Sequence, residues 1–217
     1  MTYTALEKAA RDRALDIFGA FHPNAEDMVP GGTGAVLLLG PQEPGFWATF
    51  TASPEYQDSA PDPLDRWSKR VIGALASDLN ATAVFPSDGP PYPPFYRWAV
   101  RSGRAWASPV TLLVQDRAGL MVSYRAALML PERIDLPSSD PAPCTTCNTK
   151  PCLTACPVGA LTGDGYDLPA CHAFLDTPKG SDCMTNGCAV RRACPVSQTY
   201  GRVPEQSAFH MKAFHSR

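Results

Sequence analysis

The distribution of cysteine constrains this chain more than any other feature of its sequence. All eight cysteines lie between Cys144 and Cys194, and the first 143 residues contain none. Such a segment indicates a compact site held by sulfur, beside a cysteine-free region long enough to bury a core of its own. Disulfides, zinc and iron–sulfur clusters are the sulfur chemistries to be weighed.

The even number of cysteines is compatible with disulfides, but the rest of the chain indicates a reducing compartment. The N-terminal segment MTYTALEKAARDRALDIF places charged residues among its apolar ones, so it lacks the apolar core of a secretory signal. The longest apolar run, AVLLLG, is far shorter than the ~18 residues that cross a bilayer. The net charge of -2 gives no overall attraction to nucleic acid or to anionic membranes. We expect a cytoplasmic protein without membrane association, in which structural disulfides are rare.

The spacing of the cysteines indicates iron–sulfur ligation. The run C-x2-C-x4-C-x3-C-P begins at Cys144, and a looser second set ends in another Cys-Pro at Cys194-Pro195. In bacterial two-cluster ferredoxins, the run C-x2-C-x2-C-x3-C-P sends its fourth cysteine to the other cluster. The same crossed pairing uses every thiol of this chain. The predicted ligands are Cys144, Cys147, Cys152 and Cys194 for the first [4Fe–4S] cluster, and Cys156, Cys171, Cys183 and Cys188 for the second.

Zinc is the main alternative. Cys144-x2-Cys147 alone is half of a zinc site, and His172 or His210 could complete a site with three cysteines. Zinc sites more often pair two C-x2-C units, whereas two Cys-Pro crossings and groups of three cysteines plus one favour clusters. Four residues, NTKP, separate Cys147 from Cys152, whereas the ferredoxin run has two at this place. The chain therefore departs from the ferredoxin pattern inside its first ligand set.

Apolar periodicity predicts an α/β domain in the cysteine-free region. The possible capping box Thr4-x-x-Glu7 and the apolar spacing after it predict a first helix over about residues 5–20. The other expected helices cover 62–79 and 95–103, and the expected strands cover 35–40, 46–51, 81–85, 109–116 and 120–130, with the last two around the turn 116–119. A proline-rich connector at 131–143 follows. The predicted organisation is an α/β domain over residues 1–135 and a cluster domain over residues 136–217.

Several segments resemble the epoxyqueuosine reductases, a family related to the reductive dehalogenases. The similarity is strongest from GLMVSYRAALMLPERIDLP through CTTCNTKPCLTACPVGAL to YDLPACHAFL and the terminal Cys-Pro. VPGGTGAVLLLGP and AVFPSDGPP are similar to early segments of the family. The resemblance implies an α+β fold. It consists of a nitroreductase-like, cobalamin-type N-terminal domain with a central, mostly antiparallel sheet, and a small ferredoxin-like domain with two [4Fe–4S] clusters.

The resemblance also implies a function. The clusters would pass single electrons to cobalamin, or less favourably to a flavin, in the N-terminal domain of a corrinoid-dependent reductase. A flavodoxin or a ferredoxin reductase would supply the electrons, and a small molecule would be the substrate. Asp88 takes the place of the family's proton donor, although Asp followed by Gly and Pro is also ordinary turn chemistry. The family's C-terminal helical-repeat domain, which contacts tRNA, has no counterpart before Arg217, so tRNA is not an expected partner.

A second function fits the same residues. The chain could be a ferredoxin-type electron carrier without catalytic activity, whose N-terminal domain only docks a partner. A cysteine-free region of full domain size favours the reductase, because a simple ferredoxin needs far less chain. Departures from the family favour the carrier, since FYRWAVRSGRAWAS stands after the Asp88 loop where the family has a glycine-rich segment.

Overall fold

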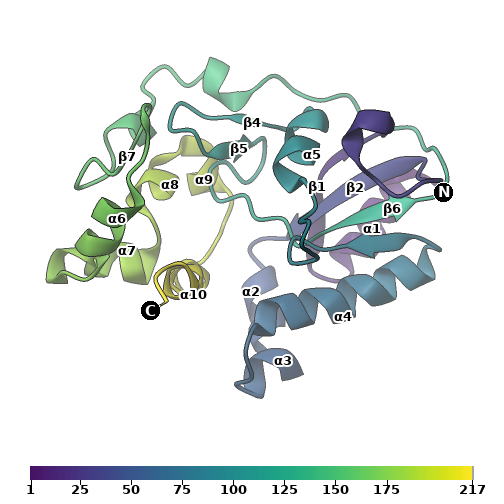
Figure 1. Cartoon of the computed structure of the whole chain (residues 1–217), viewed down its shortest axis with the longest axis horizontal. Helices are drawn as coiled ribbons and strands as arrows, with labels where there is room; N and C mark the ends of the chain where they lie inside the picture. Colours follow the sequence, from purple (N-terminus) through teal and green to yellow (C-terminus); the bar gives the residue numbers. More distant parts are fainter. Residues whose placement is uncertain (217) are drawn as a thin grey trace. The chain divides into compact units, whose positions relative to one another are not determined.

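The computed structural model describes residues 1–216, and the chain divides into two compact units (Figure 1). Unit 1 consists of residues 1–105 and 123–140, and unit 2 consists of residues 106–122 and the chain from 141 onward. The sequence predicts one boundary, at residue 135, whereas the chain passes between the units three times. Residues 106–122, expected in the N-terminal domain, belong to the unit that contains the cysteines.

Unit 1 is an α+β structure with a four-stranded antiparallel sheet, as the sequence predicts in outline. In spatial order the strands are β1 (Leu15–Phe21), β2 (Ala35–Pro41), β6 (Ala126–Leu130) and β3 (Thr82–Val84). Every residue of β2 and β6 is buried, so both faces of the central strands are covered. These two strands form the centre of the core of unit 1.

Two helices of unit 1 pack on this sheet, and the others flank it. They are α1 (Tyr3–Arg11), α2 (Phe46–Thr51), α3 (Pro54–Gln57), α4 (Pro63–Asp78) and α5 (Phe95–Arg101), with the 3-10 turn η1 (Ala25–Asp27). α1 packs against β1, and α4 packs against β3 and β6. The predictions of helices at 62–79 and 95–103 and of strands at 35–40 and 81–85 are confirmed to within a few residues.

The predicted helix over residues 5–20 is wrong in its second half. α1 ends at Arg11, and the segment LDIFGAF forms β1, whose residues are buried except for Ala20. A helix would place part of this apolar run in solvent, whereas a strand inside a covered sheet buries both of its faces. The N-cap of α1 is Thr2 rather than the expected Thr4. The side chain of Thr2 accepts a hydrogen bond of 3.3 Å from the Ala5 N–H.

The segment FWATFT, predicted as a strand, is the helix α2. Phe46 and Phe50 lie four residues apart and are both fully buried, as one face of a helix requires. Both rings make edge-on contacts with Trp67 of α4, at centroid distances of 5.3 and 6.2 Å. The packing of the aromatic rings therefore overrides the strand propensity of this segment.

The predicted hairpin over residues 109–130 does not form. β5 (Leu113–Gln115) pairs with β4 (Ala105–Ala107) in a separate two-stranded sheet, whereas β6 joins the sheet of unit 1. The turn survives, because Gln115 and Gly119 exchange backbone hydrogen bonds of 2.9 and 3.0 Å. After this turn the chain leaves unit 2 at residue 122.

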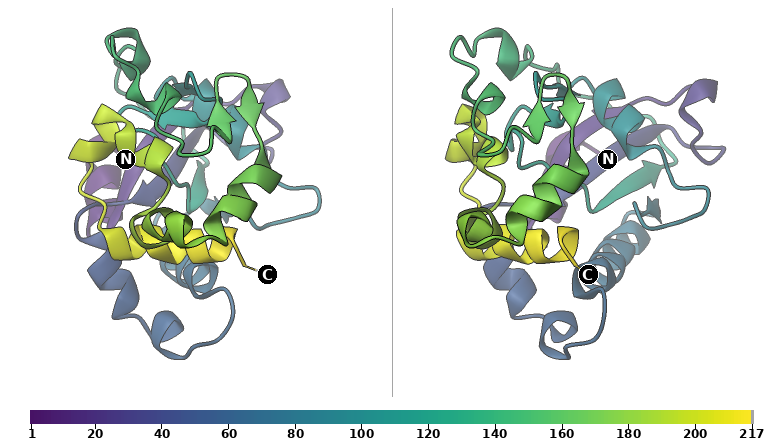
Figure 2. Two further views of the ribbon diagram at one scale, coloured as in Figure 1. Left: turned by 90° about the vertical axis from the view of Figure 1, so that its left-hand side faces the viewer. Right: turned by 60° about the vertical axis from the view of Figure 1, so that its left-hand side comes forward.

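Unit 2 consists of short helices and turns around the cysteines. Its elements after β4 and β5 are η2 (Pro143–Thr145), η3 (Pro151–Leu153), β7 (Leu161–Thr162), β8 (Gly165–Tyr166), α6 (Leu168–Leu175), η4 (Pro178–Gly180), α7 (Ser181–Asn186), α8 (Ala189–Ala193), α9 (Pro195–Thr199) and α10 (Pro204–Phe214). α10 packs alongside α7 (Figure 2). Within residues 1–216, no helix has both the length and the apolar character needed to cross a membrane.

Candidate metal centre

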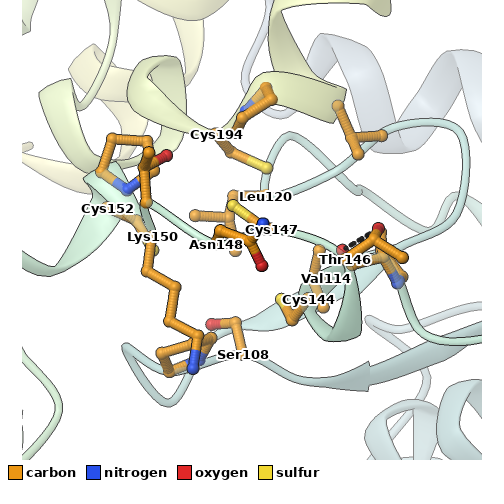
Figure 3. Close-up of a pocket in the computed structure, with 16 residues that line it drawn as sticks. Ser108, Val114, Leu120, Cys144, Thr146, Cys147, Asn148, Lys150, Cys152 and Cys194 are labelled. Carbon is orange, nitrogen blue, oxygen red and sulfur yellow. Dashed lines mark hydrogen bonds between the residues drawn. The ribbon is translucent and has the colours of Figure 1, made fainter.

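Four cysteines line one cavity in unit 2. The cavity has a volume of about 330 Å³, and Figure 3 shows the four thiols around it. Two come from the 3-10 turns η2 and η3, one follows η2, and the last joins α8 to α9. We call them the first quartet: Cys144, Cys147, Cys152 and Cys194. The structure thus brings together the set that the crossed spacing predicts.

Proline positions the thiols of this quartet. Pro143 and Pro151 each occupy the first position of a 3-10 turn, and in each case a cysteine follows directly. Pro195 likewise opens α9 directly after Cys194. Because proline fixes its own φ and carries no N–H, it suits the first turn of a helix and holds the adjacent residue at a defined angle.

The segment 106–122 forms one wall of the cavity. Val114 and Leu120 line it as apolar residues, and the Leu120 N–H donates a hydrogen bond of 2.9 Å to the Ser197 hydroxyl of α9. Gly119 has φ +56, and a Cβ at this position would lie 2.5 Å from the Ser197 nitrogen and 3.1 Å from the Cys194 sulfur. A glycine is therefore required for the close approach of this wall to the thiol.

The other four cysteines form a second quartet in unit 2, and two of them, Cys156 and Cys188, also pack against the buried cluster that contains Cys152 and Cys194. They come from the loop after η3, from α6, from α7 and from the residue before α8, and are Cys156, Cys171, Cys183 and Cys188. Cys183 is buried, and Cys171 and Cys188 pack around it with Leu175 and Met211. Electrostatic interactions also link the Cys171 thiol to the Cys188, Cys156 and Cys183 thiols.

Burial governs the protonation of the thiols. It is the largest cause that raises the pKa of Cys144, Cys152, Cys171 and Cys183. Neighbouring thiols of the same quartet raise these pKa values further. For Cys144 these neighbours are Cys194, Cys152 and Cys147, and the Lys150 side chain acts in the opposite direction. A buried group of thiols is stable as thiolates only when positive charge, such as a metal, enters with it.

Hydrogen-bond donors face sulfur atoms of the second quartet. The Tyr166 hydroxyl donates to the Cys171 sulfur at 3.3 Å, and the Ala160 N–H donates to the Cys156 sulfur at 3.2 Å. Burial, followed by the Cys171 contact, raises the pKa of Tyr166, so its hydroxyl remains a donor. Hydrogen bonds to sulfur are one of the means by which proteins set the potential of iron–sulfur sites.

A half-buried cation lies near the second quartet. The Arg191 guanidinium donates to the Leu120 carbonyl, and it interacts electrostatically with Cys188 and Tyr166. Although Arg191 keeps some exposed surface, desolvation lowers the pKa of its guanidinium. An arginine in a dry environment is stabilised by anionic neighbours, which thiolate ligands would supply.

The thiols do not converge on one metal ion. In the described part of the chain, no three side chains of the His, Cys, Asp and Glu types lie close enough together to hold a single ion. All eight cysteines are free thiols. A zinc ion needs four donors, each about 2.0–2.3 Å away.

Of the two histidines offered as zinc ligands, His172 has other partners. His172 Nδ1 lies 2.7 Å from His215 Nδ1, and its ring stacks on Phe214 at a centroid distance of 4.7 Å. His215 Nε2 in turn lies 3.1 Å from the Asp176 carboxylate. These contacts bring the C-terminal end of α10 onto α6 and direct Nδ1 of His172 toward His215.

Asp88 lies in a turn of unit 1. Its Oδ2 accepts a hydrogen bond of 2.8 Å from the Phe85 N–H, and its N–H donates 3.0 Å to the Phe85 carbonyl. Its Oδ1 lies 3.6 Å from the Lys69 ammonium, and the side chain is 43% exposed. These contacts are those of a turn-forming aspartate with a cationic neighbour.

Sequence reasoning identified the thiols but not the groups around them. Tyr166, Arg191 and Ser108 escape notice because their roles depend on tertiary contacts with the quartets. The one signal in the sequence was for Tyr166, which stands five residues before Cys171 in the segment that resembles the reductase family. Ser108 had none, because its segment reads as part of the N-terminal domain.

Known proteins do not assign this site. No protein-family model matches the chain, and no curated protein matches it significantly. The resemblance to the epoxyqueuosine reductases therefore remains a hypothesis that rests on the segments quoted above. The geometry of the two quartets is the basis for a functional proposal.

Proposed function

We propose that unit 2 binds two [4Fe–4S] clusters and that the protein transfers single electrons. One observation carries this proposal: the eight thiols separate into two quartets. Each quartet takes one cysteine that precedes a proline from the other part of the sequence, Cys194 in the first quartet and Cys156 in the second. When bound, such clusters supply one-electron redox chemistry at potentials that their surroundings set. In this proposal unit 2 is ferredoxin-like and unit 1 is nitroreductase-like.

The residues of the chain perform distinct tasks in this proposal. The thiols bind iron after they lose their protons, and the apolar wall of Val114 and Leu120 keeps water from one side of the first quartet. Tyr166 donates to the sulfur of Cys171, and Arg191 places positive charge beside Cys188. Each of these contacts favours sulfur in its anionic form, as cluster ligation requires.

Metal analysis of the purified protein tests the proposal. Protein isolated without oxygen is expected to be brown, with broad visible absorption and about eight irons per chain. Reduction with dithionite is expected to give electron paramagnetic resonance (EPR) signals from two clusters. A colourless protein with stoichiometric zinc would contradict the proposal.

The acceptor of the electrons separates two forms of the proposal. In the first, unit 1 holds a corrinoid or another cofactor or substrate, and the protein is a reductase supplied by a flavodoxin or a ferredoxin reductase. Its support is the large buried core of unit 1, which makes this unit a full domain. In the second, the protein is an electron carrier and unit 1 docks a partner. Asp88 acts as a proton donor only in the first.

Cofactor titration distinguishes these forms. Hydroxocobalamin and, separately, a flavin are added to the iron-loaded protein, and binding is followed by absorbance and calorimetry. Saturable binding with one site per chain supports the reductase. Absence of binding by both, with electron exchange between the protein and a reduced flavodoxin, supports the carrier. Asp88→Asn is expected to slow turnover of a reductase and to leave exchange by a carrier unchanged.

A further inference from the structure

Ser108 has a buried hydroxyl without a partner. The residue follows β4 and is 8% exposed, and its Oγ makes no hydrogen bond within the described residues. Its backbone is fully engaged, because its N–H donates 2.8 Å to the Leu112 carbonyl and its carbonyl accepts 3.0 Å from the Thr111 N–H. A buried hydroxyl without a partner costs about 1–3 kcal/mol, so the fold keeps this group at a penalty.

The side chain of Ser108 lines the cavity of the first quartet. Figure 3 shows it at the edge of the cavity, which Cys144 and Lys150 also line. The other polar residues of the lining, apart from the thiols, are exposed: Thr146, Asn148, Thr149 and Lys150. Within the described lining, Ser108 is thus the one buried polar side chain besides cysteine.

The buried residues that line the cavity beside Ser108 are apolar or are cysteines. Val114 and Leu120, from the same segment, line the cavity with apolar side chains and offer no side-chain acceptor. A hydroxyl is both a donor and an acceptor, and it binds an anion more strongly than a neutral group. Thiolate sulfur in this cavity would satisfy the donor that the protein itself leaves unpaired.

We propose that Ser108 tunes the first cluster by donating a hydrogen bond from its hydroxyl to the sulfur around that cluster. The inference rests on the proposed function, and it assigns a role to a segment far from the cysteine run in the sequence. Reduction adds negative charge to the cluster and its sulfur ligands, so the hydrogen bond strengthens on reduction. Ser108 therefore raises the reduction potential of the first cluster and leaves the second unchanged.

Three substitutions in the full-length protein test the role of Ser108. Ser108→Ala removes the hydroxyl, and Ser108→Thr keeps it. Ser68→Ala is the matched control, because it removes a buried hydroxyl from unit 1, where Ser68 donates 2.7 Å to the Leu64 carbonyl. Potentials are measured by EPR-monitored titration of the iron-loaded proteins. The titrations are repeated in a Cys183→Ser background, where the first cluster gives the remaining signal.

Ser108→Ala is expected to reduce the ratio of reduced to oxidised first cluster at fixed potential by about three- to tenfold. A tenfold change equals about 59 mV for one electron. Ser108→Thr and Ser68→Ala are expected to titrate like the wild type. In the iron-free protein, Ser108→Ala is expected to raise the melting temperature, because it removes an unpaired buried hydroxyl.

The possible outcomes separate this inference from the proposed function. A wild-type protein without iron would overturn both. A two-cluster protein whose Ser108→Ala variant keeps the wild-type potential would overturn the inference alone. If Ser108→Ala fails to load the first cluster, loading by Ser108→Thr supports the donor role. Failure of both variants would indicate a packing role and overturn the inference.

Discussion

Cys194 decides how the sulfur ligands are paired. It stands 38 residues after Cys156 in the sequence, yet it lines the same cavity as Cys144, Cys147 and Cys152. Pro195 follows it and starts α9, so the thiol lies at the point where the chain changes direction. Because Cys194 belongs to the first quartet and Cys156 to the second, each run of cysteines gives one ligand to the other quartet.

Pairs of cysteine substitutions test this arrangement. Cys194→Ser and Cys152→Ser are each expected to lower the iron content from about eight to about four. The double variant is expected to hold about four as well, because both residues serve one cluster. Cys194→Ser combined with Cys183→Ser is expected to hold almost none. The crossed pairing would be wrong if Cys194→Ser and Cys183→Ser together still held about four irons.

The ion pair between Glu55 and Arg70 makes the stability of unit 1 depend on pH. The Arg70 guanidinium donates to both oxygens of this carboxylate and is the main cause that lowers its pKa to about 2. Because the pKa of Glu55 is lower in the folded protein than its ordinary value of 4.5, the ion pair with Arg70 stabilises the fold fully above about pH 4.5. This contribution is lost as the pH falls through about 2. Because Arg70 is 53% exposed, solvent screening limits the contribution to about 1 kcal/mol.

The pH dependence of Glu55→Gln should follow from this pairing. At pH 7 the variant is expected to unfold at lower denaturant concentration than the wild type, by about 1 kcal/mol. The difference is expected to shrink between pH 4.5 and pH 2, as the wild-type carboxylate gains its proton. Denaturant titrations at pH 7 and pH 3 measure it. A difference that is the same at both values would exclude the ion pair as its source.

At the level of elements, the turn 115–119 presents the wall of the first quartet. Oε1 of Gln115 accepts from the N–H groups of Arg117 and Ala118, and Ser197 holds the end of the turn on α9. Gly119 completes the turn in the left-handed region. The turn is thus rigid where it meets Cys194.

Gly119→Ala should therefore damage the first site. The variant bears the strain of a positive φ and a collision with Ser197, together about 2 kcal/mol or more. Gly159→Ala is the control, because Gly159 has φ +65 but has open space around its Cα. Thermal unfolding and iron content are the measurements. Equal losses in the two variants would show that backbone strain alone is responsible.

Sequence reasoning succeeded where local pattern and tertiary structure agree. α4 carries its apolar residues at helical spacing, and β2 is a run of apolar residues between turns, so both were predictable. The segment 15–21 and the segment 46–51 were not, because a short apolar run packs equally well as helix or strand until its neighbours are known. The spacing of the cysteines groups the four that line one cavity, and their ligand role stays a prediction, whereas Ser108 enters the site only through the tertiary placement of residues 106–122.

On the scale of the whole molecule, unit 2 is discontinuous. Between its two segments the chain runs through residues 123–140, which contain β6. β6 pairs with β2 on one side and with β3 on the other, so it is a central strand of unit 1. The two units are therefore joined by three passages of the chain rather than by one linker.

A fragment that begins at residue 136 tests the importance of the discontinuity. It contains every cysteine but lacks Ser108, Val114 and Leu120 from the wall of the first cavity. We expect it to bind about four irons, at the second quartet, because the first quartet becomes open to water. A fragment that begins at residue 106 restores the wall and is expected to bind more. Eight irons in the shorter fragment would show that the wall is dispensable.

The interleaving of the units limits how this metal-binding part can be exchanged between proteins. A cut at the proline-rich connector removes residues 106–122, and a cut at residue 106 removes β6 from the sheet of unit 1. Neither single junction transfers an intact metal-binding unit and leaves an intact sheet behind. Transplanting this unit into another protein would require a junction at residue 106 and one on each side of β6, so we expect the two units to have been inherited together.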